Sequence, residues 1–152
     1  MGNKGSWTDS GSRFCFNAAK TFANGWYSEY DHTMDPSRET FDGKLYGINA
    51  VRDGTISNDG KVTLKLQGAN GEFPLYLIFQ RKAGANSGIP QYGDKVVITE
   101  QEKERSSKSS WKAALGRGDS FTFQWGSGIS EIKVCRMNLN DSSVNVVIGK
   151  SG

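Results

Sequence analysis

Apolar and polar residues follow two different periods along the chain. In the N-terminal part, four apolar side chains recur four positions apart: Phe14, Ala18, Phe22 and Trp26. This spacing places them on one stripe of a helix over residues 13–24. Ser10 or Ser12 can cap the start of that helix, and Gly25 can adopt the left-handed conformation that ends it. The pattern predicts one N-terminal helix with a buried stripe.

After a polar stretch over residues 27–39, which we interpret as a connector, the apolar positions alternate with period two. Val62, Leu64 and Leu66 alternate with polar residues and predict a half-buried strand. Residues 73–80 are nearly all apolar, as in a central strand. Further strands are expected at 41–51, 96–99, 111–115, 121–125, 132–137 and 144–148.

These elements predict an all-β fold, an antiparallel β-sandwich of about eight strands preceded by one N-terminal helix. The change of period near residue 40 predicts two parts. Residues 1–39 form the helix and connector, and residues 40–152 form the sandwich.

Composition narrows the class of protein further. The chain has 152 residues, 36% of them hydrophobic, and a net charge of +3. This apolar content suffices for a packed core. Lys and Arg are interleaved with Asp and Glu, so we expect no nucleic-acid partner. We also expect no membrane span, because the apolar runs have the length of strands. No apolar leader follows Met1, so either the protein is cytosolic or its true start lies upstream.

His32 is the only histidine of the chain. A zinc protease needs the pattern H-E-x-x-H on a helix, where two imidazoles share one face, and this pattern is missing. A serine or cysteine triad would have to use His32, which we place on the surface of the connector. A glycosidase needs two carboxylates in one cleft, and the sequence does not place them. We therefore predict no catalytic residue and no metal ligand in this chain.

Several segments resemble a known family. The most specific are Met1-Gly2, the run Cys15-Phe16-Asn17-Ala18 and the run Gly25-Trp26-Tyr27. With stretches at 41–45, 79–88 and 93–97, they are similar to the gametolysin-like metallopeptidases of algae, a metzincin family, from the methionine turn onward. The resemblance implies that residues 1–39 are a remnant of the catalytic domain. Met1 would stand in the turn beneath the zinc, and the zinc-binding helix is missing.

The resemblance carries further expectations. The family is secreted, so it implies an extracellular location and a glycoprotein or glycan as partner, with an upstream catalytic domain as a further partner. It also favours a disulfide between Cys15 and Cys135 over two buried thiols. Zinc belongs to the parent family, and we expect no cofactor in this chain. Whether the protein is an enzyme stays open, and we expect the chain alone to be inactive.

Candidate binding residues lie in the predicted sandwich. Arg117-Gly118-Asp119 is a tripeptide that many integrin ligands display, although a simple turn explains it as well. Trp111 and Trp125, with Tyr76 and Tyr92, could stack on sugar rings where they are exposed, although most such aromatics belong to cores. Asn140-Asp141-Ser142 is a glycosylation sequon on an expected loop.

Two functions follow from these observations. The first is the C-terminal region of a gametolysin-like secreted zinc endopeptidase that acts on extracellular-matrix or cell-wall glycoproteins, with the sandwich as a stabilising or substrate-docking module. The second is a free-standing β-sandwich module that binds glycans or glycoproteins. An upstream H-E-x-x-H would favour the first, and a row of exposed aromatics would favour the second.

Overall fold

The protein is an all-β sandwich, as the alternating pattern predicts. The computed structural model describes residues 21–22, 24–68, 72–82, 93–101 and 109–151. Its elements in chain order are η1 (Ser28–Tyr30), β1 (Asp31–Met34), β2 (Phe41–Tyr46), α3 (Ile48–Arg52), β3 (Thr63–Leu66), β4 (Leu75–Gln80), β5 (Lys95–Glu100), β6 (Ser110–Leu115), β7 (Ser120–Trp125), β8 (Gly128–Asn138) and β9 (Ser143–Lys150).

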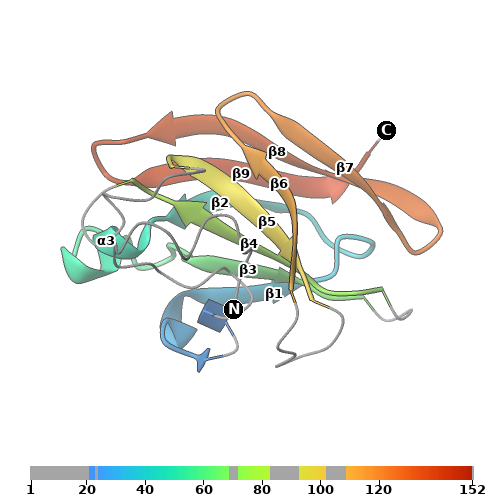
Figure 1. The fold of residues 1–152 in the computed structure, drawn as a ribbon, viewed down its shortest axis with the longest axis horizontal. Coiled ribbons are helices and arrows are strands. Elements are labelled where there is room, and N and C mark those ends of the chain that lie inside the picture. Colours follow the sequence, from blue (N-terminus) through green and yellow to red (C-terminus); the bar gives the residue numbers. More distant parts are fainter. Residues whose placement is uncertain (1–20, 23, 69–71, 83–92, 102–108, 152) are drawn as a thin grey trace.

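The strands form two sheets that pack face to face. One sheet has the order β1-β3-β4-β5-β6, and the other has the order β2-β9-β8-β7. All pairs are antiparallel except β1 with β3, which is parallel. In Figure 1 the orange and red strands β8 and β9 lie over the green and yellow strands of the other sheet. The larger sheet therefore has β1 and β6 as its edge strands, and the smaller sheet has β2 and β7. The edges β1 and β2 flank one open side of the sandwich, and the edges β6 and β7 flank the other.

The core lies between the sheets and draws on the inner faces of both. It contains fully buried residues from the long alternating strands, among them Leu64, Leu77, Phe79, Ile98, Ile132, Val146 and Ile148. Strand β4 is the middle strand of the larger sheet, as expected from its apolar run over 73–80. Burial of these side chains is the main favourable term for the fold.

The larger sheet is also covered on its outer face, which corrects one expectation. Tyr76, Ile78 and Val97 form a second cluster there, with Phe22 packed against it. The Phe22 ring meets the Tyr76 ring edge-on, with 5.6 Å between centroids. All four residues of β3 are consequently buried rather than alternating. Lys65 is 5% exposed, and its Nζ lies 5.3 Å from the Phe22 ring centroid.

The N-terminal helix is described only at its C-terminal end. Residues 21, 22 and 24 are helical, and Gly25 follows with a φ of 66°, as the sequence predicts. Residues 1–20, including Met1 and Cys15, lie outside the described residues. The prediction that the apolar stripe is buried is wrong at Trp26, whose side chain is 56% exposed. The helix ends before this residue, so Trp26 does not share the helical face.

Two further boundaries differ from the prediction. Residues 41–51 form strand β2 only as far as Tyr46, and α3 follows, with Ala50 buried. The expected connector contains β1, which pairs with β3 and buries Met34. The sandwich therefore includes residues on the N-terminal side of position 40. A strand of four mostly polar residues is too short for its alternation to be read, and its pairing depends on a distant partner.

Candidate functional site

A groove lies on the side of the sandwich that is flanked by the edge strands β6 and β7. Its volume is about 310 Å³, within the range of small-molecule sites. We call it the aromatic groove, and it is lined by Glu72, Phe73, Leu75, Glu100, Lys112, Phe121, Phe123, Gln124 and Trp125. It is open to solvent on one side and closed by the sandwich core on the other.

Strand β7 supplies the aromatic wall. Phe121, Phe123 and Trp125 alternate along it, so they share its inner face. The two phenyl rings are nearly parallel, at 14° with 5.8 Å between centroids. The Phe123 and Trp125 rings are nearly perpendicular, at 87° with 5.6 Å between centroids. Phe121 and Phe123 are only partly buried, because no further strand of the described chain covers β7 on that side. Phe73 faces them from the segment before β4 and is 48% exposed.

Trp125 forms the floor of the groove and is 4% exposed. Its indole N–H donates a hydrogen bond of 3.0 Å to Asp35 Oδ1, which satisfies the buried donor. Asp35 also accepts a hydrogen bond from the Ser37 hydroxyl at 2.7 Å. The Ser37 hydrogen bond, with a smaller contribution from Trp125, lowers the pKa of Asp35 below its ordinary value. The floor is therefore fixed in orientation.

Polar groups line the rim of the aromatic groove. Lys112 Nζ lies 3.3 Å from Glu100 Oε1, so β5 and β6 carry one ion pair at the rim. Glu72 and Gln124 complete the polar lining. Apolar ring faces beside a few carboxylate, ammonium and amide groups are suited to a ligand that is apolar on one face and polar at its edges.

The opposite open side of the sandwich has a second groove, with a volume of about 460 Å³. Its lining is mainly polar, and much of it is already paired. The Tyr46 hydroxyl donates to Ser57 Oγ at 3.3 Å, and the Ser57 hydroxyl donates to Asp59 Oδ1 at 2.9 Å. Since these groups satisfy one another and only Phe41 and Tyr46 supply rings, we favour the aromatic groove as the binding site.

Asp31 lies at the start of edge strand β1 and is partly buried. Burial raises the pKa of Asp31 to about 6, against the opposing effects of the Thr63 hydroxyl and of Lys61. The Thr63 hydroxyl is near enough to lower the pKa but falls short of hydrogen-bond geometry, and Asp31 Oδ1 is buried without a partner among the described residues.

Replacing Asp31 with asparagine is expected to stabilise the protein at neutral pH. The folded chain holds the Asp31 proton more tightly than the unfolded chain, whose pKa is near 3.8. The contribution of Asp31 to the free energy of unfolding is therefore fully present below pH 3.8 and is lost as the pH rises through about 6. We expect Asp31→Asn to gain about 1–2 kcal/mol at pH 7, after discounting for solvent screening, and nothing at pH 3.5. Urea unfolding at both pH values measures this, and equal stabilities at pH 7 would contradict it.

The residues present do not fit a catalytic zinc. His32 lies in β1, where its ring is tilted against Phe41 at 5.6 Å between centroids, and not on a helix with a second ligand. Within the described ranges, no group of three or more His, Cys, Asp or Glu side chains could hold a metal ion. We therefore derive no metal-dependent step for this chain.

The Arg117-Gly118-Asp119 segment forms the tight turn between β6 and β7. Gly118 has a φ of 85°, and its N–H donates to the Val134 carbonyl at 2.9 Å. Asp119 Oδ2 accepts a hydrogen bond of 2.9 Å from the Gly116 N–H, so the carboxylate closes the turn. All three residues are exposed. The role of this segment as a turn therefore explains why position 118 is a glycine and position 119 an aspartate.

The other candidate residues have separate locations. Trp111 on β6 is 41% exposed, whereas Trp125 and Tyr76 are buried, which excludes both as open stacking surfaces. Tyr92 lies outside the described residues. Cys135 is an exposed free cysteine at an irregularity of β8. No disulfide to Cys15 is seen, and because Cys15 is not described, that bond stays a prediction.

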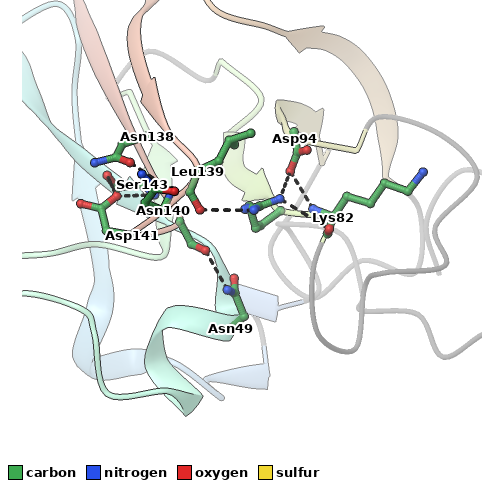
Figure 2. A network of polar contacts seen from close by, with 10 residues as sticks. Asn49, Lys82, Asp94, Asn138, Leu139, Asn140, Asp141 and Ser143 are labelled. Atoms are coloured by element: carbon green, nitrogen blue, oxygen red, sulfur yellow. Dashed lines mark hydrogen bonds and ion pairs between the residues drawn. The ribbon is translucent and has the colours of Figure 1, made fainter.

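A polar network on the α3 side holds the turn between β8 and β9 (Figure 2). Arg81 Nη1 lies 2.6 Å from Asp94 Oδ1, and Nη2 donates to the Leu139 carbonyl at 3.2 Å. Asp94 Oδ1 also accepts from the Lys82 N–H at 2.9 Å. Arg81 therefore connects the segment after β4, the residue before β5 and the β8–β9 turn.

The sequon lies in that same turn. Asn140 is exposed, and its N–H donates to Asn138 Oδ1 at 3.0 Å. Ser142 is buried, and its hydroxyl accepts from Asn49 of α3 at 2.7 Å. These bonds fix the hairpin against α3. They connect segments of the chain to one another, so we assign the network to stability.

Sequence reasoning missed most of the aromatic groove. The sequence alone does not distinguish Phe73, Phe121 and Phe123 from core aromatics, although Phe121, Phe123 and Trp125 alternate along one predicted strand. That period predicts a shared face, but it does not show that the strand lies at the edge of its sheet. The exposure of the two phenyl rings follows from that edge position.

Comparisons with known protein families, curated proteins and solved structures found no match to this chain. The resemblance to gametolysin-like peptidases stays a prediction. No helix in the described part of the chain is long and apolar enough to cross a membrane.

Proposed function

We propose that this chain is a non-catalytic docking module that binds a glycan, or the glycan of a glycoprotein, in the aromatic groove. The observation that carries this proposal is the set of partly exposed rings of Phe73, Phe121 and Phe123 beside a charged rim. A pyranose ring has apolar C–H faces and polar hydroxyl edges. It can therefore stack on the phenyl rings while Glu100 and Lys112 bond its hydroxyls.

A docking role suits either setting that the sequence suggests. A free-standing module would hold a glycoprotein by its glycan, and a module downstream of a peptidase domain would bring extracellular-matrix or cell-wall glycoproteins to that domain. The resemblance to secreted peptidases supports an extracellular location within this proposal. Catalysis by the chain itself has no support, because His32 lies against Phe41 with no second histidine anywhere in the sequence.

Phe123→Leu is expected to weaken glycan binding by about 3–10-fold, because it removes a ring face while it keeps apolar volume in the groove. Thr122→Ala is the matched control, since Thr122 lies on the opposite, exposed face of the same strand. A screen of extracellular-matrix and cell-wall glycans identifies the best ligand, and calorimetry then compares the two variants with the parent chain. Equal affinities for all three proteins would contradict the proposal, as would a screen without any bound glycan.

A further inference from the structure

The sequon Asn140-Asp141-Ser142 lies in the β8–β9 turn and takes no part in the aromatic groove. It is the only Asn-x-Ser or Asn-x-Thr sequence of the chain. Asn140 is exposed, and its bond to Asn138 Oδ1, at 3.0 Å, is made by its backbone N–H. The turn therefore holds the main chain of Asn140 without using its side-chain amide, which is the group that an N-glycan modifies.

The third residue of the sequon is in the opposite condition. Ser142 is 6% exposed, and its hydroxyl accepts a hydrogen bond of 2.7 Å from Asn49 Nδ2. Its carbonyl accepts another, of 2.8 Å, from the Gly47 N–H. Because the motif requires a hydroxyl at its third position, the modifying enzyme must recognise that hydroxyl together with the amide. The folded turn thus exposes the acceptor and hides the rest of the motif against α3 (Figure 2).

We propose that Asn140 is an N-glycosylation site that is modified before the β8–β9 turn packs against α3. The donor is a lipid-linked oligosaccharide diphosphate. A bond forms between Asn140 Nδ2 and C1 of the first sugar, the bond from C1 to the diphosphate oxygen breaks, and the amide proton passes to a base of the transferase. This inference goes beyond the proposed function and shares with it only the extracellular location.

A glycan at Asn140 would leave the aromatic groove open. Strand β8 begins at Gly128, which pairs with Trp125 of the groove floor, and it ends at Asn138 beside the sequon. A strand of 11 residues, at about 3.3 Å per residue, separates these two ends by roughly 30 Å. The attached glycan and the bound glycan therefore occupy different ends of the sandwich.

Expression of the full chain behind a cleavable secretory leader in eukaryotic cells tests the site. We expect the secreted chain to carry one glycan, seen as a mass increase that a peptide N-glycosidase removes and that is missing in Asn140→Gln. Asn58→Gln is the matched control and should keep the glycan, because Asn58 is an exposed turn asparagine that is also followed by aspartate but begins no sequon. A secreted chain without a glycan, or a glycan that persists in Asn140→Gln, would overturn the assignment and leave binding in the groove untouched.

Incubation of purified, unglycosylated chain with membranes that contain the transferase and its donor tests the order of events. The folded parent chain should be modified slowly. Asn49→Ala, which removes the bond to the Ser142 hydroxyl and keeps the sequon, should be modified about fivefold faster, the change typical of losing one hydrogen bond. Asn58→Ala, which keeps that bond, should match the parent. Equal rates for the parent and Asn49→Ala would overturn the proposed order.

Discussion

Replacing Phe79 with alanine is expected to lower the free energy of unfolding by about 3–5 kcal/mol. Phe79 is 1% exposed on β4, the middle strand of the larger sheet, and it belongs to the core between the sheets. Its removal leaves a cavity that the paired strands on both sides cannot easily fill. Urea unfolding followed by tryptophan fluorescence measures the loss.

Phe73→Ala is the comparison for this measurement. It deletes the same side chain from an exposed position and is expected to cost less than about 1 kcal/mol. A loss at Phe79 no larger than the loss at Phe73 would mean that the two sheets do not share the core described above.

Arg81→Ala is expected to lower the free energy of unfolding by about 2–4 kcal/mol. The Arg81 side chain is 17% exposed, and its Nη1 lies 2.6 Å from Asp94 Oδ1. Removal of the guanidinium therefore leaves the partly desolvated Asp94 carboxylate without its ion-pair partner. It also removes the donor to the Leu139 carbonyl, and amides near the β8–β9 turn should then exchange hydrogen faster.

Arg52→Ala is the control for the Arg81 prediction. Arg52 and Asp53 form an ion pair of 3.4 Å in which both side chains are more than half exposed, and such pairs contribute little. We expect a change within about 0.5 kcal/mol for Arg52→Ala. Similar values for the two arginine variants would contradict the structural role assigned to the network.

The strands that the sequence predicts well are those with long, uninterrupted alternation or apolar runs. Residues 121–125 and 144–148 fall inside β7 and β9, and the apolar run at 73–80 contains the central strand β4. In these segments the local pattern and the tertiary environment agree. The pattern therefore suffices to predict both the element and the class of the fold.

The elements that the sequence predicts poorly depend on distant partners. Strand β3 has an alternating pattern but is buried on both faces, because Phe22 and Tyr76 cover Lys65 from outside. Strand β1 is four residues long, and its parallel pairing with β3 involves residues about thirty positions away. Local periodicity contains no information on either contact.

Of the residues that line the aromatic groove, only Trp125 is predicted from the sequence as a binding residue. The sequence predicts aromatic stacking at Trp111 and Trp125, but Trp125 is the buried floor of the groove rather than an open surface. Phe121 and Phe123 are the partly exposed rings of β7, and their exposure depends on the order of strands in the smaller sheet. Strand order follows from the packing of the whole chain, so single positions do not reveal which aromatics face solvent.

Binding of a glycan in the aromatic groove between β6 and β7 can be tested directly. The most direct measurement is a titration of the isotope-labelled chain with the tightest-binding oligosaccharide, followed by amide chemical shifts. We expect saturable shifts concentrated at residues 72–75, Glu100, Lys112 and 121–125, with little change at the opposite open side. Shifts centred instead on the second groove, at Phe41–Tyr46 and residues 57–60, would contradict it, and so would the absence of saturable shifts.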